Sequence, residues 1–193
     1  MDTWLTEDRF VVDQVIRPIA NLYRVSANGQ PVVFVRQKKL AIKEDIRFFG
    51  DEKESEELFR IKARAVLELG GRYDVTTPTG EPIGALEKVF GKSLLRSTWR
   101  VLGADGQEQA IVKERSTFVA ALRRAIDFVP YGDLVPILFH FTIDEGERHL
   151  GDFTRRVGFR DTYDLDLSGD TDKTIDRRLA VALAVALDAL QSR

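Results

Sequence analysis

Aromatic, polar and apolar positions repeat in the same order along much of the chain. Each copy has an aromatic residue, a polar residue and a valine, then turn residues with a glycine, then a second apolar stretch; the copies begin at Tyr23, Tyr73 and Trp99. A degenerate fourth copy covers residues 138–153. The aromatic residue and the valine lie on one strand face, and Asn-Gly or Asp-Gly supplies the positive φ that a tight turn needs. The repeat therefore predicts a series of β-hairpins.

The C-terminal segment predicts a helix that has to be enclosed. Residues 179–190 are apolar on every side, with Leu179, Leu183 and Leu187 in one row and valines opposite, so this helix has no face for water. Thr171 or Asp172 can cap it, and we expect it at about residues 172–191. Strands at the observed spacing form sandwiches or barrels. We predict a β-rich fold, α+β by content, in which a barrel of antiparallel hairpins surrounds this apolar helix.

A second, shorter helix is expected between Ser116 or Thr117 and about residue 128, before Pro130. Its apolar residues fall at helical spacing, with Arg123 and Arg124 between them. Two interpretations remain open. The helix covers one end of the sheet, or it lies on a membrane surface as a basic amphipathic helix.

Composition limits the classes of protein to which the chain can belong. Its 193 residues fit a single domain over residues 1–193, and its net charge of −2 argues against a nucleic-acid partner. The absence of cysteine excludes disulfides, thiolate catalysis and cysteine-based metal sites, and it fits a reducing cytoplasm. The N-terminus lacks a signal-peptide pattern, and the longest apolar run, residues 179–187, is too short for a membrane span. We therefore expect a cytoplasmic protein without a transmembrane segment.

The candidate phosphate- or lipid-binding residues are six cations: Arg36, Lys38, Lys39, Arg60, Lys62 and Arg64. The last three project from one face of an alternating strand at residues 58–65. If the strand that carries Arg36 pairs beside it, the two rows merge into a positive patch that favours phosphate groups. The alternative is a solvated strand face whose cations pair with nearby glutamates. The acidic loop at residues 51–57 joins these strands and would repel an anionic membrane at that end.

No metal site or cofactor is predicted. Residues 164–169 match the first half of a calcium-binding EF-hand loop, but its twelfth position is Ile175, where a bidentate glutamate is required. The simpler interpretation is a strand with Tyr163, Leu165 and Leu167 inward, followed by aspartates at the positive end of the helix dipole. The alternative is weak calcium binding by Asp164, Asp166 and Asp170.

No catalytic signature is present either. The chain has two histidines; His140 is expected to point outward from a strand, and His149 to lie near a turn. Neither is accompanied by a recognisable nucleophile motif. The sequence thus favours a non-enzymatic protein, and an enzyme of undetected type ranks last.

Several stretches, taken in order, resemble the tubby C-terminal-like superfamily, which includes phospholipid scramblases, LURP-one-related proteins and soluble bacterial relatives. These stretches are residues 35–39, 44–49, 61–64, 93–96 and 187–190. The resemblance spans nearly the whole chain. It implies a closed barrel of about twelve strands around a central helix, in agreement with the hydrophobic pattern.

The resemblance also implies a type of ligand. Tubby domains bind phosphoinositides through basic residues, whereas scramblases carry a calcium-responsive acidic segment before the final helix. This chain lacks the cysteine-rich and proline-rich regions of animal scramblases, so scrambling is not expected. The leading hypothesis is a non-enzymatic module, peripheral to the membrane, that binds anionic lipid headgroups or another phosphate ligand at the basic strand surface. The alternative is a protein-interaction or scaffold domain without a small ligand.

Overall fold

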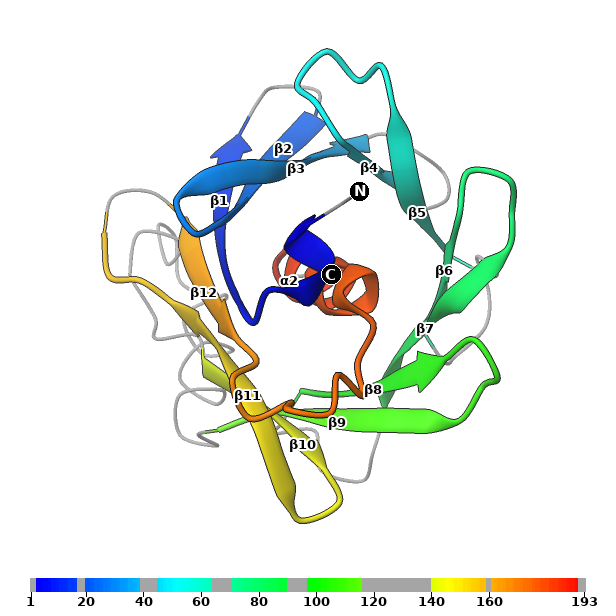
Figure 1. Ribbon diagram of the computed structural model, residues 1–193, viewed down its shortest axis with the longest axis vertical. Helices are drawn as coiled ribbons and strands as arrows, with labels where there is room; N and C mark the ends of the chain where they lie inside the picture. The colour runs from blue at the N-terminus through cyan, green and yellow to red at the C-terminus, as the bar shows by residue number, and fades with distance from the viewer. Residues whose placement is uncertain are drawn as a thin grey trace, which may run out of the picture.

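A closed barrel surrounds a central helix in the computed structural model (Figure 1). The structure describes residues 3–16, 20–38, 45–63, 71–89, 97–115, 140–158 and 161–190. Within these ranges, twelve antiparallel strands each pair with their neighbours in sequence, and β1 pairs with β12 to close the ring. The predicted twelve-stranded barrel around a C-terminal helix is therefore confirmed.

The strands have the lengths expected of hairpins. They are β1 (Arg9–Ile16), β2 (Ala20–Ala27), β3 (Gln30–Lys38), β4 (Asp45–Phe49), β5 (Glu57–Ala63), β6 (Arg72–Thr76), β7 (Pro82–Val89), β8 (Thr98–Gly103), β9 (Glu108–Glu114), β10 (His140–Glu145), β11 (Arg148–Arg155) and β12 (Thr162–Asp166). A short 3₁₀-helix, η1 (Thr3–Thr6), precedes them, and α2 (Arg177–Ala189) follows.

The repeat that predicted hairpins corresponds to β2–β3, β6–β7, β8–β9 and β10–β11. The turn between β2 and β3 has Asn28 and Gly29 at φ values of 50° and 75°, and Gly80, Gly106 and Gly146 also have positive φ. Such angles are strained for most L-residues and match the twist of a tight hairpin. Local turn chemistry therefore sets the position of these four connections.

Side chains alternate between the barrel interior and the outer wall. On β5, Phe59 and Ile61 are fully buried, whereas Lys62 is exposed. Phe59 stacks on Phe48 of the neighbouring strand with ring centroids 4.2 Å apart. Trp4 of η1 lies against Phe59 at one end of the barrel. Charged residues of these strands accordingly face outward, where a ligand can reach them.

The central helix α2 is buried on all sides, as its sequence predicts (Figure 1). Leu179, Leu183 and Leu187 each have no exposed surface, and burial of a leucine side chain contributes about 1.5–3 kcal/mol. The predicted start of the helix was wrong. The helix is capped by Asp176, whose side chain accepts a hydrogen bond from the Arg178 backbone amide. Turns occupy the preceding residues, because Asp170 binds the local backbone there instead of starting a helix.

The shorter helix expected after Ser116 or Thr117 lies outside the described residues. So does Ser93-Leu94-Leu95-Arg96, one of the stretches on which the resemblance was based.

Candidate functional site

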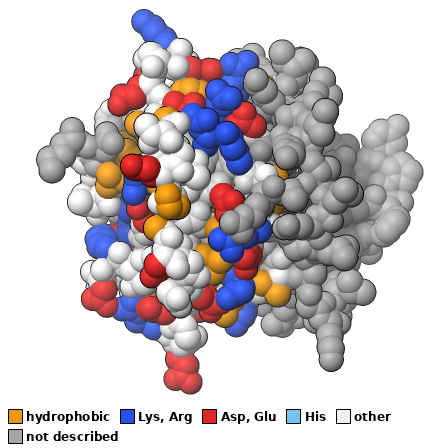
Figure 2. Space-filling model, turned by 90° about the vertical axis from the view of Figure 1, so that its right-hand side faces the viewer, with side chains coloured by type: hydrophobic (Ala, Val, Ile, Leu, Met, Phe, Trp, Pro, Cys, Tyr) orange, Lys and Arg blue, Asp and Glu red, His pale blue; other side chains and the backbone are white. Residues whose placement is uncertain are grey.

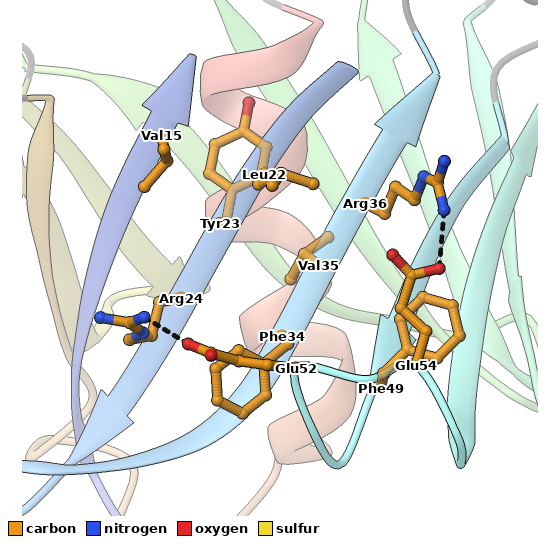
Figure 3. A pocket seen from close by; sticks show the side chains of 10 residues that line it. All are labelled: Val15, Leu22, Tyr23, Arg24, Phe34, Val35, Arg36, Phe49, Glu52 and Glu54. Atoms are coloured by element: carbon orange, nitrogen blue, oxygen red, sulfur yellow. Dashed lines mark hydrogen bonds and ion pairs between the residues drawn. The ribbon is translucent and has the colours of Figure 1, made fainter. Parts of the chain in front are cut away.

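A pocket of about 260 Å³ lies on the barrel wall where the loop between β4 and β5 meets strands β1–β3 (Figure 3). This loop, residues 50–56, is the acidic loop that the sequence placed at residues 51–57; Glu57 belongs to β5. Apolar and charged side chains share the lining: Val15, Leu22, Tyr23, Arg24, Phe34, Val35, Arg36, Phe49, Glu52 and Glu54. The pocket can therefore hold a ligand that has both an apolar part and charged groups.

Two ion pairs attach the acidic loop to the wall of this pocket (Figure 3). Glu52 binds the guanidinium of Arg24 on β2, and Glu54 binds that of Arg36 on β3 at 2.8 Å. The carboxylates of Glu52 and Glu54 thus lie on the basic strand face, and this agrees with the alternative in which the cations pair with nearby glutamates. The Arg24 guanidinium also lies 5.9 Å from the ring centroid of Phe34.

The acidic loop keeps its shape through its own hydrogen bonds. Asp51 accepts hydrogen bonds from the Ser55 hydroxyl and, at 2.7 Å, from the Lys53 amide, and these bonds hold the pKa of Asp51 below its usual value. Glu54 has a φ of 58°, and the Gly50 amide closes the base of the loop onto the Glu56 carbonyl at 3.0 Å. This internal turn presents Glu52 and Glu54 toward the strands.

Three arginines lie in one row across β3, β4 and β5. Arg36 is directly opposite Arg47, and Arg47 is directly opposite Arg60. Like charges in directly opposite positions of an antiparallel sheet are destabilising. Elsewhere on the barrel, an equivalent row alternates in sign, with Glu87 between Arg72 and Arg100. The uninterrupted arginine row is therefore an unusual feature of this wall.

Carboxylates surround the arginine row and partly neutralise it. Arg47 binds Asp45 at 3.0 Å and lies 3.8 Å from Glu57, which also binds Arg60 at 2.5 Å. The hydrogen bonds that Arg47 donates to the Asp45 carboxylate raise the pKa of Arg47, so this guanidinium stays charged. At one end of the row, Arg36 has Glu54 of the acidic loop as its partner.

The structure brings together only part of the predicted basic set. Arg36, Arg60 and Lys62 are on the outer wall, and Lys38 ends β3, but Lys39 and Arg64 lie outside the described residues. The strands of Arg36 and Arg60 are not direct neighbours, because β4 lies between them. The direct pairing of these two strands, on which the merging of the two rows depended, is therefore not present.

Sequence reasoning missed two cations of this wall. Arg47 belongs to β4, which joins the two strands considered, and Arg24 lies beside them on β2. The signal for Arg24 was its place as the polar residue of the first repeat. The barrel face that contains β5–β7 has blue and red side chains interspersed, without a large area of one sign (Figure 2).

The three aspartates considered for calcium have basic partners and do not share one environment. Asp164 binds Arg156 at 2.6 Å and Asp166 binds Arg9 at 3.1 Å, both on the outer wall. Asp170 is fully buried and binds Arg177 at 2.7 Å.

Asp170 and Arg177 form a buried ion pair at the beginning of α2. Burial alone raises the pKa of Asp170, but hydrogen bonds from Arg177 and from the amides of Ile175 and Thr174 lower it below its usual value. Arg177 also donates to the Glu7 carbonyl at 2.8 Å. Arg177 therefore connects the central helix to the N-terminal part of the chain.

Both histidines lie in one chain of hydrogen bonds on β10 and β11. Asp152 lies between them, 2.8 Å from His140 Nε2 and 3.1 Å from His149 Nε2. His149 Nδ1 is 2.9 Å from Asp144, and this hydrogen bond, together with the one to Asp152, raises the pKa of His149. His140 alternates with buried Phe141 and faces outward, as expected.

A third polar cluster holds the end of α2. Asp188 accepts hydrogen bonds from the hydroxyls of Tyr23, at 2.8 Å, and Tyr163. Burial is the largest cause of the raised pKa of Asp188, and the two tyrosines only partly oppose it. Tyr23 also lines the pocket, so one side chain contacts both the pocket and the central helix.

Among the described residues, no group of three or more His, Cys, Asp or Glu side chains has an arrangement that could hold a metal ion. No described helix has the length and hydropathy needed to cross a membrane.

Comparison with known proteins identifies the family. A family model described as LURP-one-related matches residues 32–188, which include most of β3, the acidic loop, the arginine row and most of α2. No curated protein and no solved structure matches the chain. The family model covers well over half of the sequence and agrees with the observed barrel and central helix. The chain therefore belongs to the LURP-one-related family, within the tubby-like and scramblase-like superfamily.

Proposed function

We propose that the wall formed by β2–β5 binds a phosphate-bearing ligand, such as the headgroup of an anionic lipid. The observation that carries this proposal is the row of Arg36, Arg47 and Arg60 in directly opposite positions. Folding alone does not favour three adjacent like charges, and an anion that bridges them removes their repulsion. Membership of a family with a tubby-like fold supports the same class of ligand by analogy.

The chemistry of the row suits phosphate. A guanidinium presents several N–H donors in a fixed plane and binds phosphate oxygens in pairs. Arg36 and Arg47 have side chains that are 40% and 41% exposed, so both are accessible to a ligand. Lys62 is exposed on the same wall and forms no ion pair within the described part of the chain. Together these groups provide charge-assisted donors on three strands.

Flotation with liposomes tests the proposal. The protein is mixed with vesicles of phosphatidylcholine alone, with phosphatidylserine, or with phosphatidylinositol 4,5-bisphosphate. Each mixture is measured at about 50 mM and about 150 mM salt, because the higher concentration screens the attraction between exposed charges more strongly. The wild type should float only with anionic vesicles and less at the higher salt concentration. Arg36→Gln/Arg47→Gln should weaken binding at least about tenfold, because each hydrogen bond to a charged group contributes about 1.5–3 kcal/mol.

The matched control is Arg72→Gln/Arg100→Gln. It removes the same charge from the same barrel, but from the row in which Glu87 separates the arginines. This control should bind like the wild type. Equal losses in both double variants would indicate a general charge effect without a site. Failure of the wild type to bind any vesicle would reject the lipid proposal and move the search to protein partners.

A further inference from the structure

In the described conformation, carboxylates of the chain itself occupy two arginines of the proposed binding wall. Glu52 lies on Arg24 and Glu54 lies on Arg36, and all four side chains line one pocket (Figure 3). An external anion can bind either guanidinium fully only after its glutamate has moved. The same two contacts therefore show where anionic groups fit and what competes with them.

We infer that the acidic loop is an internal competitor, and that the ligand which displaces it has two anionic groups joined by a short apolar part. This inference rests on the proposed function, which it makes more specific. Glu52 and Glu54 stand where the two anionic groups of the ligand would bind. Displacement of the loop exposes both guanidinium groups at once.

The positions of four side chains on β2 and β3 determine the distance between the anionic groups of the ligand and the polarity of the surface between them. Leu22 is directly opposite Arg36, and Arg24 is directly opposite Phe34, so the arginines lie on one diagonal of a four-residue square and the apolar residues on the other. Diagonal neighbours on paired strands are about 7–8 Å apart. Two phosphate groups at the arginines would thus have an apolar surface between them. A free bisphosphate with a hydrocarbon spacer has both parts, whereas an inositol bisphosphate headgroup has the anionic pair on a hydroxylated ring.

Charge and exposure indicate that the loop can be displaced. Both ion pairs are on the surface, with side chains of Arg24 and Glu52 that are 53% and 59% exposed. Exposed ion pairs typically change an equilibrium constant by a factor of about 1.4 to 5 each. Their joint removal should therefore tighten ligand binding by about 2- to 30-fold, because the loop no longer competes for the arginines.

The stability of the loop itself supports displacement as a unit. Its hydrogen bonds from Ser55 and Lys53 to Asp51 are internal, and Glu52 and Glu54 take no part in them. Loss of the two ion pairs thus leaves this turn intact. Glu52→Gln/Glu54→Gln should consequently fold like the wild type, which equal thermal transitions would verify.

Calorimetric titration with hexane-1,6-diyl bisphosphate tests the inference, with hexyl phosphate and inorganic phosphate as single-anion probes. We expect Glu52→Gln/Glu54→Gln to bind the bisphosphate about 2- to 30-fold more tightly than the wild type, with a smaller gain for the single-anion probes. The control is Glu56→Gln/Glu81→Gln, which removes the same charge. Neither of these glutamates forms an ion pair in the part of the chain that the structure describes. This control should gain little.

A second measurement follows the loop directly. The side-chain carboxylate ¹³C NMR signals of Glu52 and Glu54 should shift when the bisphosphate is added to the wild type, because the ligand separates these carboxylates from Arg24 and Arg36. Unchanged carboxylate signals together with tight binding would show that the ligand does not displace the loop, and this would overturn the inference.

The outcomes separate this inference from the proposed function. Equal affinities of the wild type and Glu52→Gln/Glu54→Gln, or equal gains in both double variants, would overturn the competitor and leave anion binding in place. Vesicles with phosphatidylinositol 4,5-bisphosphate provide the lipid arm; enhanced binding there but not to the soluble bisphosphate would identify a lipid as the source. No binding of any probe by any variant would overturn both proposals.

Discussion

Replacement of Arg177 by methionine should strongly destabilise the fold, because it leaves a buried carboxylate without its partner. Arg177 is 2% exposed and Asp170 has no exposed surface. The Arg177 guanidinium donates to Asp170 at 2.7 Å, to Asp8 at 2.5 Å and to the carbonyls of Ile175 and Glu7. Methionine has a similar length but provides none of these donors.

The expected loss is about 3–5 kcal/mol, the usual cost of removal of one partner from a buried ion pair. For a chain of this size, each kcal/mol lowers the melting temperature by about 2–4 °C, so the shift should be about 6–20 °C. Asp170→Asn in the Arg177→Met background removes the uncompensated charge. This double variant should therefore be more stable than Arg177→Met alone.

Urea unfolding is a suitable assay, because Trp4 and Trp99 are buried and report on the barrel by fluorescence. The lowered pKa of Asp170 also fixes the sign of the pH effect. Its contribution to stability is complete above the ordinary carboxyl pKa and is lost as the pH falls through the lowered value. That acid loss should be reduced in Asp170→Asn. A cost below about 1 kcal/mol for Arg177→Met, or a double variant less stable than this single variant, would refute the reasoning.

Three further predictions concern other parts of the barrel. Burial raises the pKa of Asp188. The free energy of unfolding of the wild type should therefore fall, relative to that of Asp188→Asn, as the pH rises from the ordinary carboxyl pKa through the raised value. A difference between the two proteins in urea unfolding that stays constant across this pH range would contradict the prediction. Gly84→Ala should cost at least about 1–3 kcal/mol, since its Cβ would lie 2.3 Å from a backbone oxygen, whereas Gly158→Ala, in open space, should melt like the wild type. NMR titration should give His149 a pKa above the ordinary histidine value that falls in Asp144→Asn; no change in this variant would refute the assigned cause.

Local chemistry made the hairpins and the central helix predictable. Asn28-Gly29 defines a tight turn without reference to the rest of the fold. The helix around Leu183 is apolar on every side, which indicates enclosure wherever the helix lies. Its first residue was not predictable in this way. Thr171, Asp172 and Asp176 are all suitable caps by type, and the choice depends on tertiary contacts of Asp170 and Arg177.

The candidate site depends on contacts between distant positions. Arg24 and Glu52 are 28 residues apart, and no local pattern pairs them. The arginine row depends on the register of β4 between β3 and β5, since a shift by one residue would turn Arg47 into the barrel interior. The sequence therefore indicated basic strands and an acidic loop, and it left pairing of the cations with nearby glutamates as the alternative. Which carboxylate binds which arginine, and the pocket between them, required the structure.

The two proposals together describe a wall on which an external anion and the acidic loop compete. The proposals predict that Arg72 and Arg100 do not contribute to binding, because Glu87 stands between them in their row and binds both.

NMR of the arginine Nε–Hε groups during titration with hexane-1,6-diyl bisphosphate tests ligand binding at this wall most directly. The signals of Arg24, Arg36 and Arg47 should shift with a common affinity, while those of Arg72 and Arg100 stay in place. Equal shifts of all five groups would show binding by net charge alone. Shifts confined to arginines outside β2–β5, or no shift at any concentration, would contradict anion recognition at this wall.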